Sequence, residues 1–95
     1  MEIFAKNTKF LRELYGLTQA DMFAVLGVKR STWNNYEIGL SKPFIDVLVR
    51  ISKYFGVSET DLLHTDLSKL DKYKNISKDK LPLPLPQPLP VKRNK

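Results

Sequence analysis

The sequence contains no cysteine and only one histidine, His64. These absences exclude disulfide scaffolds, cysteine-ligated zinc, thiol catalysis and a histidine cluster that could hold a metal. No apolar run approaches the roughly 20 residues that span a bilayer, and residues 1–8 lack a signal-peptide pattern. Paired carboxylates, a nucleophile with its base and a phosphate-binding loop are also missing, which argues against an enzyme. We expect a cytoplasmic protein with no cofactor and no membrane partner.

Net charge is missing from the first two thirds of the chain. Residues 1–67 carry eight Lys/Arg and eight Asp/Glu, whereas residues 68–95 carry eight bases and two acids. The formal charge of +6 therefore lies wholly in the last third. The total charge alone does not indicate that the domain binds nucleic acid. The positions of individual Lys and Arg side chains are the relevant evidence.

Proline is rare before residue 81 and abundant after it. Five of the six prolines alternate with other residues between positions 82 and 90. Each proline removes an amide donor and disfavours the helical conformation of the preceding residue, so polyproline II is expected there. The segment 81–90 is then a spacer or disordered end, a ligand for a groove on a protein partner, or a segment that folds back on its own domain. We place the folded domain at residues 1–67 and a basic, extended or disordered tail at residues 68–95.

Helical periodicity and turn residues predict five helices, and no alternating β pattern appears. The expected helices cover residues 4–15, 19–26, 30–37 and 43–55, with a fifth that starts at residues 58–61. A glycine follows each of the first four. Thr18 with Asp21 and Ser58 with Asp61 resemble capping boxes. The predicted fold is all-α, a compact five-helix bundle. The inner side of its fourth helix consists of Ile45, Leu48, Ile51, Ser52 and Phe55. Three aromatic residues are poorly placed for the core: Phe44, Tyr54 and Tyr73.

The second and third helices have the spacing of a helix-turn-helix unit. Apolar residues at positions 22, 26, 28, 33 and 36 would pack the pair across a tight turn at Gly27. Trp33 and Tyr36 lie three apart, so we expect both in the core. The free side of the third helix then carries side chains that can hydrogen-bond base edges and phosphates: Lys29, Arg30, Ser31, Asn34 and Asn35.

These landmarks, from Leu17 to Gly39 and on to Pro43 and residues 55–63, resemble the XRE family of Cro and phage-repressor type regulators. The resemblance covers about residues 4–65 and implies a lambda-repressor-like fold. It implies that Arg30, Ser31 and Asn35 lie in the major groove of DNA, with Lys29 and Asn34 at its edge. It also implies phosphate contacts by Gln19 and Lys42, and a structural ion pair between Arg12 and Glu37.

Two positions depart from the family pattern. Phe23 stands where a small residue is usual, and its ring would push two helices apart unless it turns outward. Lys29 stands where a serine N-cap is common, so a cap worth roughly 1 kcal/mol is lost. Ile38, Leu40 and Phe44 form an apolar group that is either core or interface. The family's dimers favour Leu40 and Phe44 as dimer contacts, with half-sites about 34 Å apart.

The leading hypothesis is a sequence-specific transcriptional regulator that binds double-stranded DNA, a repressor acting as a homodimer on a palindromic operator. The alternative is a protein-interaction module, such as an antitoxin-like protein that uses residues 81–90 to bind its partner.

Overall fold

The computed structural model describes residues 2–74, and every regular element in them is helical. The elements follow in the order α1 (Ile3–Leu14), α2 (Asp21–Leu26), α3 (Arg30–Glu37), α4 (Ile45–Phe55), α5 (Glu59–His64), and the 3-10 helices η1 (Leu67–Lys69) and η2 (Asp71–Tyr73). The predicted five-helix, all-α architecture is confirmed. None of the described helices is long and apolar enough to cross a membrane. The prediction for residues 81–90 lies outside the described residues.

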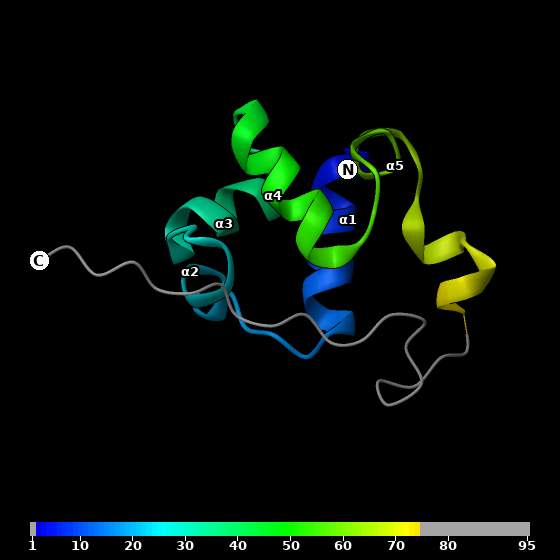
Figure 1. The fold of residues 1–95 in the computed structure, drawn as a ribbon, viewed down its shortest axis with the longest axis horizontal. Coiled ribbons are helices and arrows are strands. Elements are labelled where there is room, and N and C mark those ends of the chain that lie inside the picture. The colour runs from blue at the N-terminus through cyan, green and yellow to red at the C-terminus, as the bar shows by residue number, and fades with distance from the viewer. Residues whose placement is uncertain (1, 75–95) are drawn as a thin grey trace, which may run out of the picture.

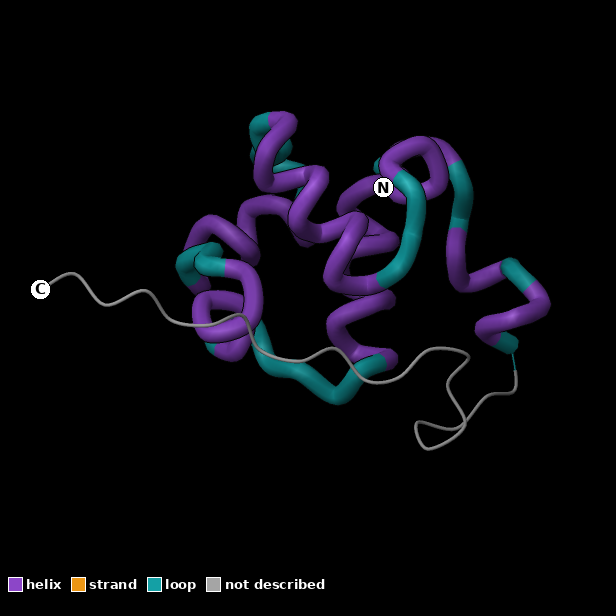
Figure 2. Tube along the Cα trace, in the orientation of Figure 1, coloured by secondary structure: helices purple, strands orange, loops and turns teal. Residues whose placement is uncertain are grey.

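Helix α1 is the centre of the fold. It packs against α3, α5 and η1, and Figure 1 shows α2 and α3 on one side of it and the two 3-10 helices on the other. Loops join the helices, and the longest of them lie before α2 and before α4 (Figure 2). The large apolar side chains that are fully buried come from all five α-helices and from η1: Phe4, Leu11, Met22, Leu26, Trp33, Ile51, Phe55, Leu62 and Leu67.

Both predicted helix starts use their side-chain caps. The Asp21 N–H donates to Thr18 Oγ1 over 3.1 Å, and the Thr18 N–H donates to Asp21 Oδ2 over 2.8 Å. At α5 the Asp61 N–H donates to Ser58 Oγ over 3.1 Å. Helix α2 nevertheless begins at Asp21 and not at Gln19, because the Asp21 N–H bonds to the carbonyl only three residues back, in a tighter turn than an α-helix.

The start of α4 differs from the prediction. Phe44 keeps an extended backbone (ψ 163°), so the helix begins at Ile45, two residues after Pro43. Ile45 then falls in the exposed first turn instead of on the inner stripe. Leu48, Ile51 and Phe55 are buried as predicted.

Two aromatic residues lie closer to the core than predicted. Tyr73 is buried, because η2 returns the chain over α1 and sets the Tyr73 ring edge-on to Phe10, with 5.6 Å between centroids. Tyr54 is half-buried against Phe55. Phe44 is exposed, as predicted.

Phe23 and Lys29 show how the chain accommodates its two unusual residues. The Phe23 side chain is 62% exposed, so the ring points to solvent and causes no overpacking between helices. Lys29 occupies the N-cap of α3, and its side chain makes no capping hydrogen bond. The start of α3 therefore lacks the side-chain acceptor that serine supplies there.

Asn7 joins α1 to the end of the domain. Its buried Nδ2 donates to the carbonyls of Leu62 (2.9 Å) and Thr65 (2.7 Å), and its Oδ1 accepts from the Leu67 N–H (3.0 Å). At the neighbouring position in the chain, Lys6 Nζ lies 2.6 Å from Asp66 Oδ2. The hydrogen bonds from Lys6 and Ser68 lower the pKa of Asp66 to about 2. These contacts hold α5 and η1 against α1.

Candidate nucleic-acid interface

The outer side of α3 carries the side chains that the sequence predicts for DNA contact. Lys29, Arg30 and Ser31 are exposed, and Asn34 and Asn35 are half-buried. A surface hollow of about 370 Å³ is lined by three of these residues together with the predicted phosphate contact from the start of α2: Gln19, Arg30, Ser31 and Asn34. Lys42 lies apart, in the loop before α4, where its Nζ is 3.6 Å from a Glu2 carboxylate oxygen.

The inner side of α3 is held by aromatic packing. Trp33 and Tyr36 are buried, as predicted. The Tyr36 ring packs edge-on against Trp33 and against Phe4 of α1, with 5.8 Å and 6.0 Å between ring centroids. Burial of each such side chain stabilises the fold by about 2 kcal/mol or more. This packing leaves the opposite side of α3 free and sets its angle to the rest of the domain.

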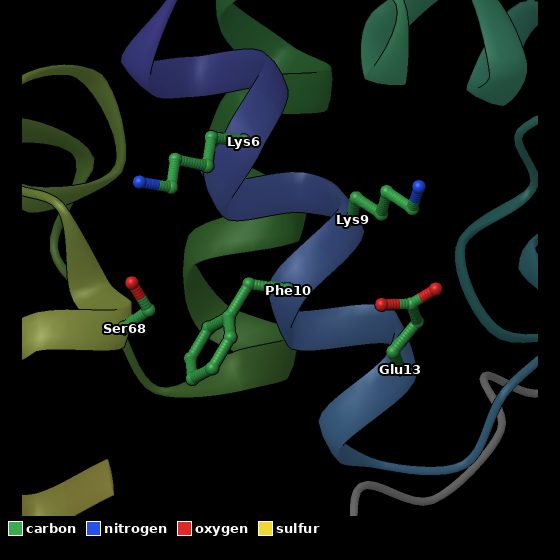
Figure 3. A pocket seen from close by; sticks show the side chains of 5 residues that line it. All are labelled: Lys6, Lys9, Phe10, Glu13 and Ser68. Atoms are coloured by element: carbon green, nitrogen blue, oxygen red, sulfur yellow. The ribbon is translucent and has the colours of Figure 1, made fainter. Parts of the chain in front are cut away.

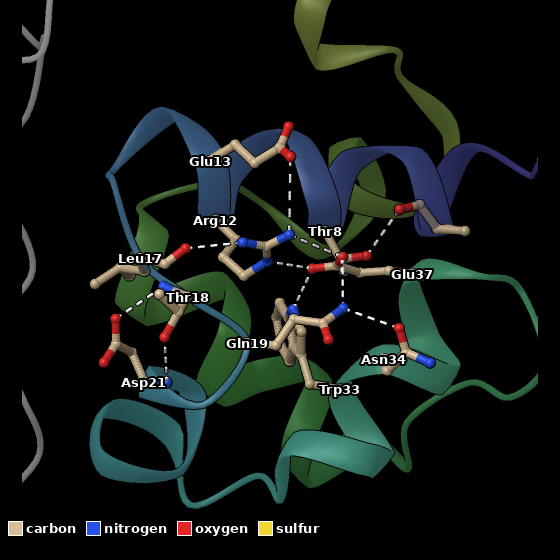
Figure 4. A network of polar contacts seen from close by, with 11 residues as sticks. Thr8, Arg12, Glu13, Leu17, Thr18, Gln19, Asp21, Trp33, Asn34 and Glu37 are labelled. Carbon is tan, nitrogen blue, oxygen red and sulfur yellow. Dashed lines mark hydrogen bonds and ion pairs between the residues drawn. The ribbon is translucent and has the colours of Figure 1, made fainter.

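Glu37 is a buried carboxylate at the junction of three helices, with 4% of the residue exposed. Its Oε2 accepts from Arg12 Nε (2.6 Å) and Trp33 Nε1 (2.5 Å), and its Oε1 accepts from Arg12 Nη2 (3.1 Å) and Gln19 Nε2 (3.0 Å) (Figure 4). Burial alone would raise the pKa of Glu37, but the hydrogen bonds from Arg12, Gln19 and Trp33 outweigh it. The pKa therefore lies below its usual value, and the carboxylate stays ionised at neutral pH.

Arg12 ties this carboxylate to the loop that enters α2. Its Nη1 donates to the Leu17 carbonyl over 2.8 Å, while the hydrogen bond to Glu37 raises the pKa of Arg12. The structure thus contains the Arg12–Glu37 pair that the family resemblance implies. Sequence reasoning missed Trp33 and Gln19 as partners of Glu37. The signal for Trp33 was present, because residues four apart on a helix share one face.

Gln19 links Glu37 to the surface of α3. Its Nε2 donates one hydrogen to Glu37 and the other to Asn34 Oδ1, over 3.0 Å in each case. Both side-chain donors of Gln19 are therefore in use inside the protein. A phosphate contact through this side-chain amide would need one of these bonds to break. The main-chain N–H of Gln19 donates to no acceptor in residues 2–74.

The turn between α2 and α3 is braced by α4. Gly27 has φ +72°, and a Cβ added there would lie 3.2 Å from Arg50 Nη1. The same guanidinium nitrogen donates to the Leu26 carbonyl over 2.8 Å. The turn therefore needs glycine both for its left-handed backbone and for the space that Arg50 occupies.

Four large apolar side chains, 59–84% exposed, follow α3. We call them the apolar ridge: Ile38, Leu40, Phe44 and Ile45. Their exposure rules out the core alternative for Ile38, Leu40 and Phe44, since the loop before α4 carries all three outward. An exposed apolar cluster on a small domain is typical of an interface.

A second hollow, of about 240 Å³, lies beside α1 and η1. Figure 3 shows Phe10 among charged side chains of both signs, and Lys6 of this group is already paired with Asp66. The described residues contain no group of three or more His, Asp or Glu side chains arranged to hold a metal. The hollow beside α3 is the stronger candidate, because all four residues that line it have polar side chains.

Comparison with known proteins places this geometry in a family. The sequence matches the family described as Helix-turn-helix (HTH_3) over residues 9–62, more than half of the chain. The chain belongs to this helix-turn-helix family. Its relatives are regulators of the XRE/Cro type, so the family resemblance is confirmed. It is a family of non-enzymatic, DNA-binding transcriptional regulators.

Three relatives illustrate the similarity. An uncharacterized HTH-type transcriptional regulator of Methanocaldococcus jannaschii, MJ0272, is 39% identical over 54 residues, which cover 57% of this chain and 82% of MJ0272. Antitoxin PezA of Streptococcus pneumoniae is 30% identical over 76% of this chain, which spans about half (47%) of PezA. The P22 c2 repressor, solved in complex with a synthetic operator, shares the fold (TM-score 0.64, 21% identity) over 70% of this chain and all of the repressor chain.

Proposed function

We propose that this helix-turn-helix chain reads a specific sequence of duplex DNA with the outer side of α3, and that it represses transcription as a homodimer on a palindromic operator. The observation that carries the proposal is the polar hollow of Gln19, Arg30, Ser31 and Asn34. It lies on a helix whose opposite side is locked into the core by Trp33 and Glu37. A rigid helix with free polar side chains can enter the major groove.

Each predicted contact has a chemical role in this proposal. The Arg30 guanidinium pairs with the two acceptors of a guanine, and Ser31 and Asn35 contact neighbouring base edges. Lys29 and Asn34 lie at the edge of the groove. Lys42 and the main-chain N–H of Gln19 bind phosphates, which supply affinity without sequence information. Because residues 1–67 carry no net charge, the placement of these cations provides the electrostatic attraction.

The apolar ridge is the proposed dimer contact, with Leu40 and Phe44 at its centre. It follows α3 directly in the chain, so pairing two ridges would bring two reading helices to one face of the dimer. Two such helices would contact half-sites about 34 Å apart. Phe44→Asp should shift the sedimentation of the full chain toward the monomer and abolish cooperative binding to a palindrome. Unchanged sedimentation would exclude the ridge as the interface.

Selection from a random duplex library tests base reading. Arg30→Ala should relax the preference at one base position of each half-site. Lys42→Ala should instead weaken binding to all sequences alike and lower the salt slope by about one. If Arg30→Ala leaves the selected motif unchanged, the assignment of Arg30 to base reading is wrong.

The similarity to PezA favours one second candidate, an antitoxin-type protein that binds a protein partner. In this proposal the partner contact is made by residues 81–90. A truncation after residue 80 should then lose neutralisation of a co-expressed toxin encoded beside the gene, while the full chain retains it. Retained neutralisation in the truncated chain would remove the proline segment from this role.

A further inference from the structure

The hydrogen bonds around Glu37 have a fixed direction. An ionised carboxylate only accepts hydrogen bonds, and each Glu37 oxygen accepts two. Gln19 must therefore turn its Nε2 toward Glu37, because its carbonyl oxygen would meet a negative charge. The orientation of a side-chain amide is set by such partners, so Glu37 determines which way the Gln19 amide points.

Gln19 in turn determines the orientation of the Asn34 amide. The second Nε2 hydrogen of Gln19 points at Asn34 and is accepted by Asn34 Oδ1 over 3.0 Å. If the Asn34 amide were reversed, two sets of N–H donors would face each other. Figure 4 shows the Asn34 nitrogen turned away from Gln19. Its Nδ2 donates to no group in residues 2–74, and Asn34 lines the hollow together with Arg30 and Ser31.

We infer that Glu37, acting through Gln19, holds the Asn34 amide with its N–H donors toward DNA and so makes Asn34 select guanine over adenine. This inference rests on the proposed function. Guanine offers two acceptors in the major groove, O6 and N7, whereas adenine offers one acceptor and one donor. An asparagine that reads adenine needs its oxygen as well as its nitrogen, and the oxygen of Asn34 is engaged by Gln19. Glu37 and Gln19 are positioning residues, and Asn34 is the contact.

The test compares motifs selected from a random duplex library by the wild type and by single variants of the full chain. The wild type should select guanine over adenine by roughly tenfold at one position of each half-site, and Asn34→Ala should remove that preference. Gln19→Leu frees the Asn34 amide to turn. It should bring adenine to within about threefold of guanine at the same position. The position read by Arg30 should not change in either variant, which provides an internal control.

Asn34→Asp changes the chemistry without changing the shape. It presents an acceptor where the amide presented donors, so guanine should become disfavoured and cytosine, which offers its N4 donor, should gain. The replaced Nδ2 donates to no group in residues 2–74, and aspartate keeps the Oδ1 that accepts from Gln19. This variant therefore breaks no hydrogen bond of the fold and tests the inference even if Gln19→Leu unfolds.

Several outcomes would overturn the inference. One is an unchanged motif with Asn34→Ala, and another is a uniform loss of affinity, which would assign Asn34 to a phosphate. An undiminished guanine preference in a folded Gln19→Leu variant would remove the positioning role. A wild type that selects no motif overturns the proposed function along with the inference. A motif that responds to Arg30→Ala but not to Asn34→Ala overturns the inference alone.

Discussion

Two buried polar clusters hold opposite sides of α1, and they differ in charge and in reach. The Glu37 cluster (Arg12, Gln19, Trp33 and Glu37) joins α1 to α3 and the start of α2 around an ion pair. The Asn7 cluster is one neutral amide with the main-chain groups of α5 and η1. The first continues through Gln19 to the surface at Asn34, whereas the second ends on main-chain atoms.

This difference separates two uses of a buried polar group. A neutral amide that satisfies main-chain groups fixes where two segments lie, and its contribution is confined to stability. A charged cluster has a higher desolvation cost and stabilises only if every partner is present. In return it fixes the orientation of a side chain at the surface. The following variants test this comparison.

Glu37→Ala should cause the largest loss. It leaves the Arg12 guanidinium, whose side chain is only 13% exposed, without its close carboxylate. Removing one partner of a buried pair costs about 3 kcal/mol or more. Urea unfolding followed by circular dichroism measures this loss. Glu13→Ala is the control, because Glu13 lies 3.8 Å from Arg12 at an exposed site and should cost almost nothing. Equal effects of the two variants would contradict the importance of burial.

Asn7→Ala should cost about 2 kcal/mol, because it leaves buried carbonyls and the Leu67 N–H without a partner. Thr8→Val is the control. Thr8 is buried beside Asn7, but its hydroxyl donates only to the Ala5 carbonyl of its own helix, so the loss should be nearer 1 kcal/mol. Under conditions in which the Asn7→Ala variant is fully folded, its affinity for DNA should equal that of the wild type. A changed base preference would show that this cluster also acts on α3.

The two clusters should respond differently to acid. The pKa of Glu37 is lowered in the folded protein, so its contribution is complete above the unfolded pKa and is lost as the pH falls through the folded pKa. The stability gap between wild type and Glu37→Ala should therefore shrink on acidification from pH 7 to pH 3. The gap for Asn7→Ala should stay constant. Asp66 titrates in all three proteins and cancels in both differences.

Lys29→Ser should have the smallest effect and the opposite sign. A serine at the N-cap of α3 can accept a hydrogen bond from the first turn, which stabilises by up to about 1 kcal/mol. It also removes a cation near the positive end of the helix dipole. Lys29→Ala separates the two terms, since it removes the charge without adding a cap. If the Lys29→Ser variant is no more stable than Lys29→Ala, the missing N-cap does not account for the destabilising effect of Lys29.

Local patterns in the chain predict most of the helices, for reasons that are visible residue by residue. The capping pairs at Thr18 and Ser58 and the glycines after the first four helices act through bonds a few residues apart. The start of α4 was harder to predict, because Pro43 tolerates both a first helical turn and an extended loop. The burial of Tyr73 depends on Phe10, which lies more than sixty residues away in the chain.

Local sequence patterns are sufficient to predict the helical class, the projecting side of α3 and the family. Periodicity, caps and side-chain chemistry are properties of neighbours in the chain. How the polar side chains share hydrogen bonds depends instead on contacts between distant parts of the chain. Glu37 selects the direction of the Gln19 amide, and Gln19 that of Asn34, through contacts between residues 18 and 15 positions apart in the chain. Hydrogen-bond direction depends on which groups folding brings together, and a list of residue types does not contain that information.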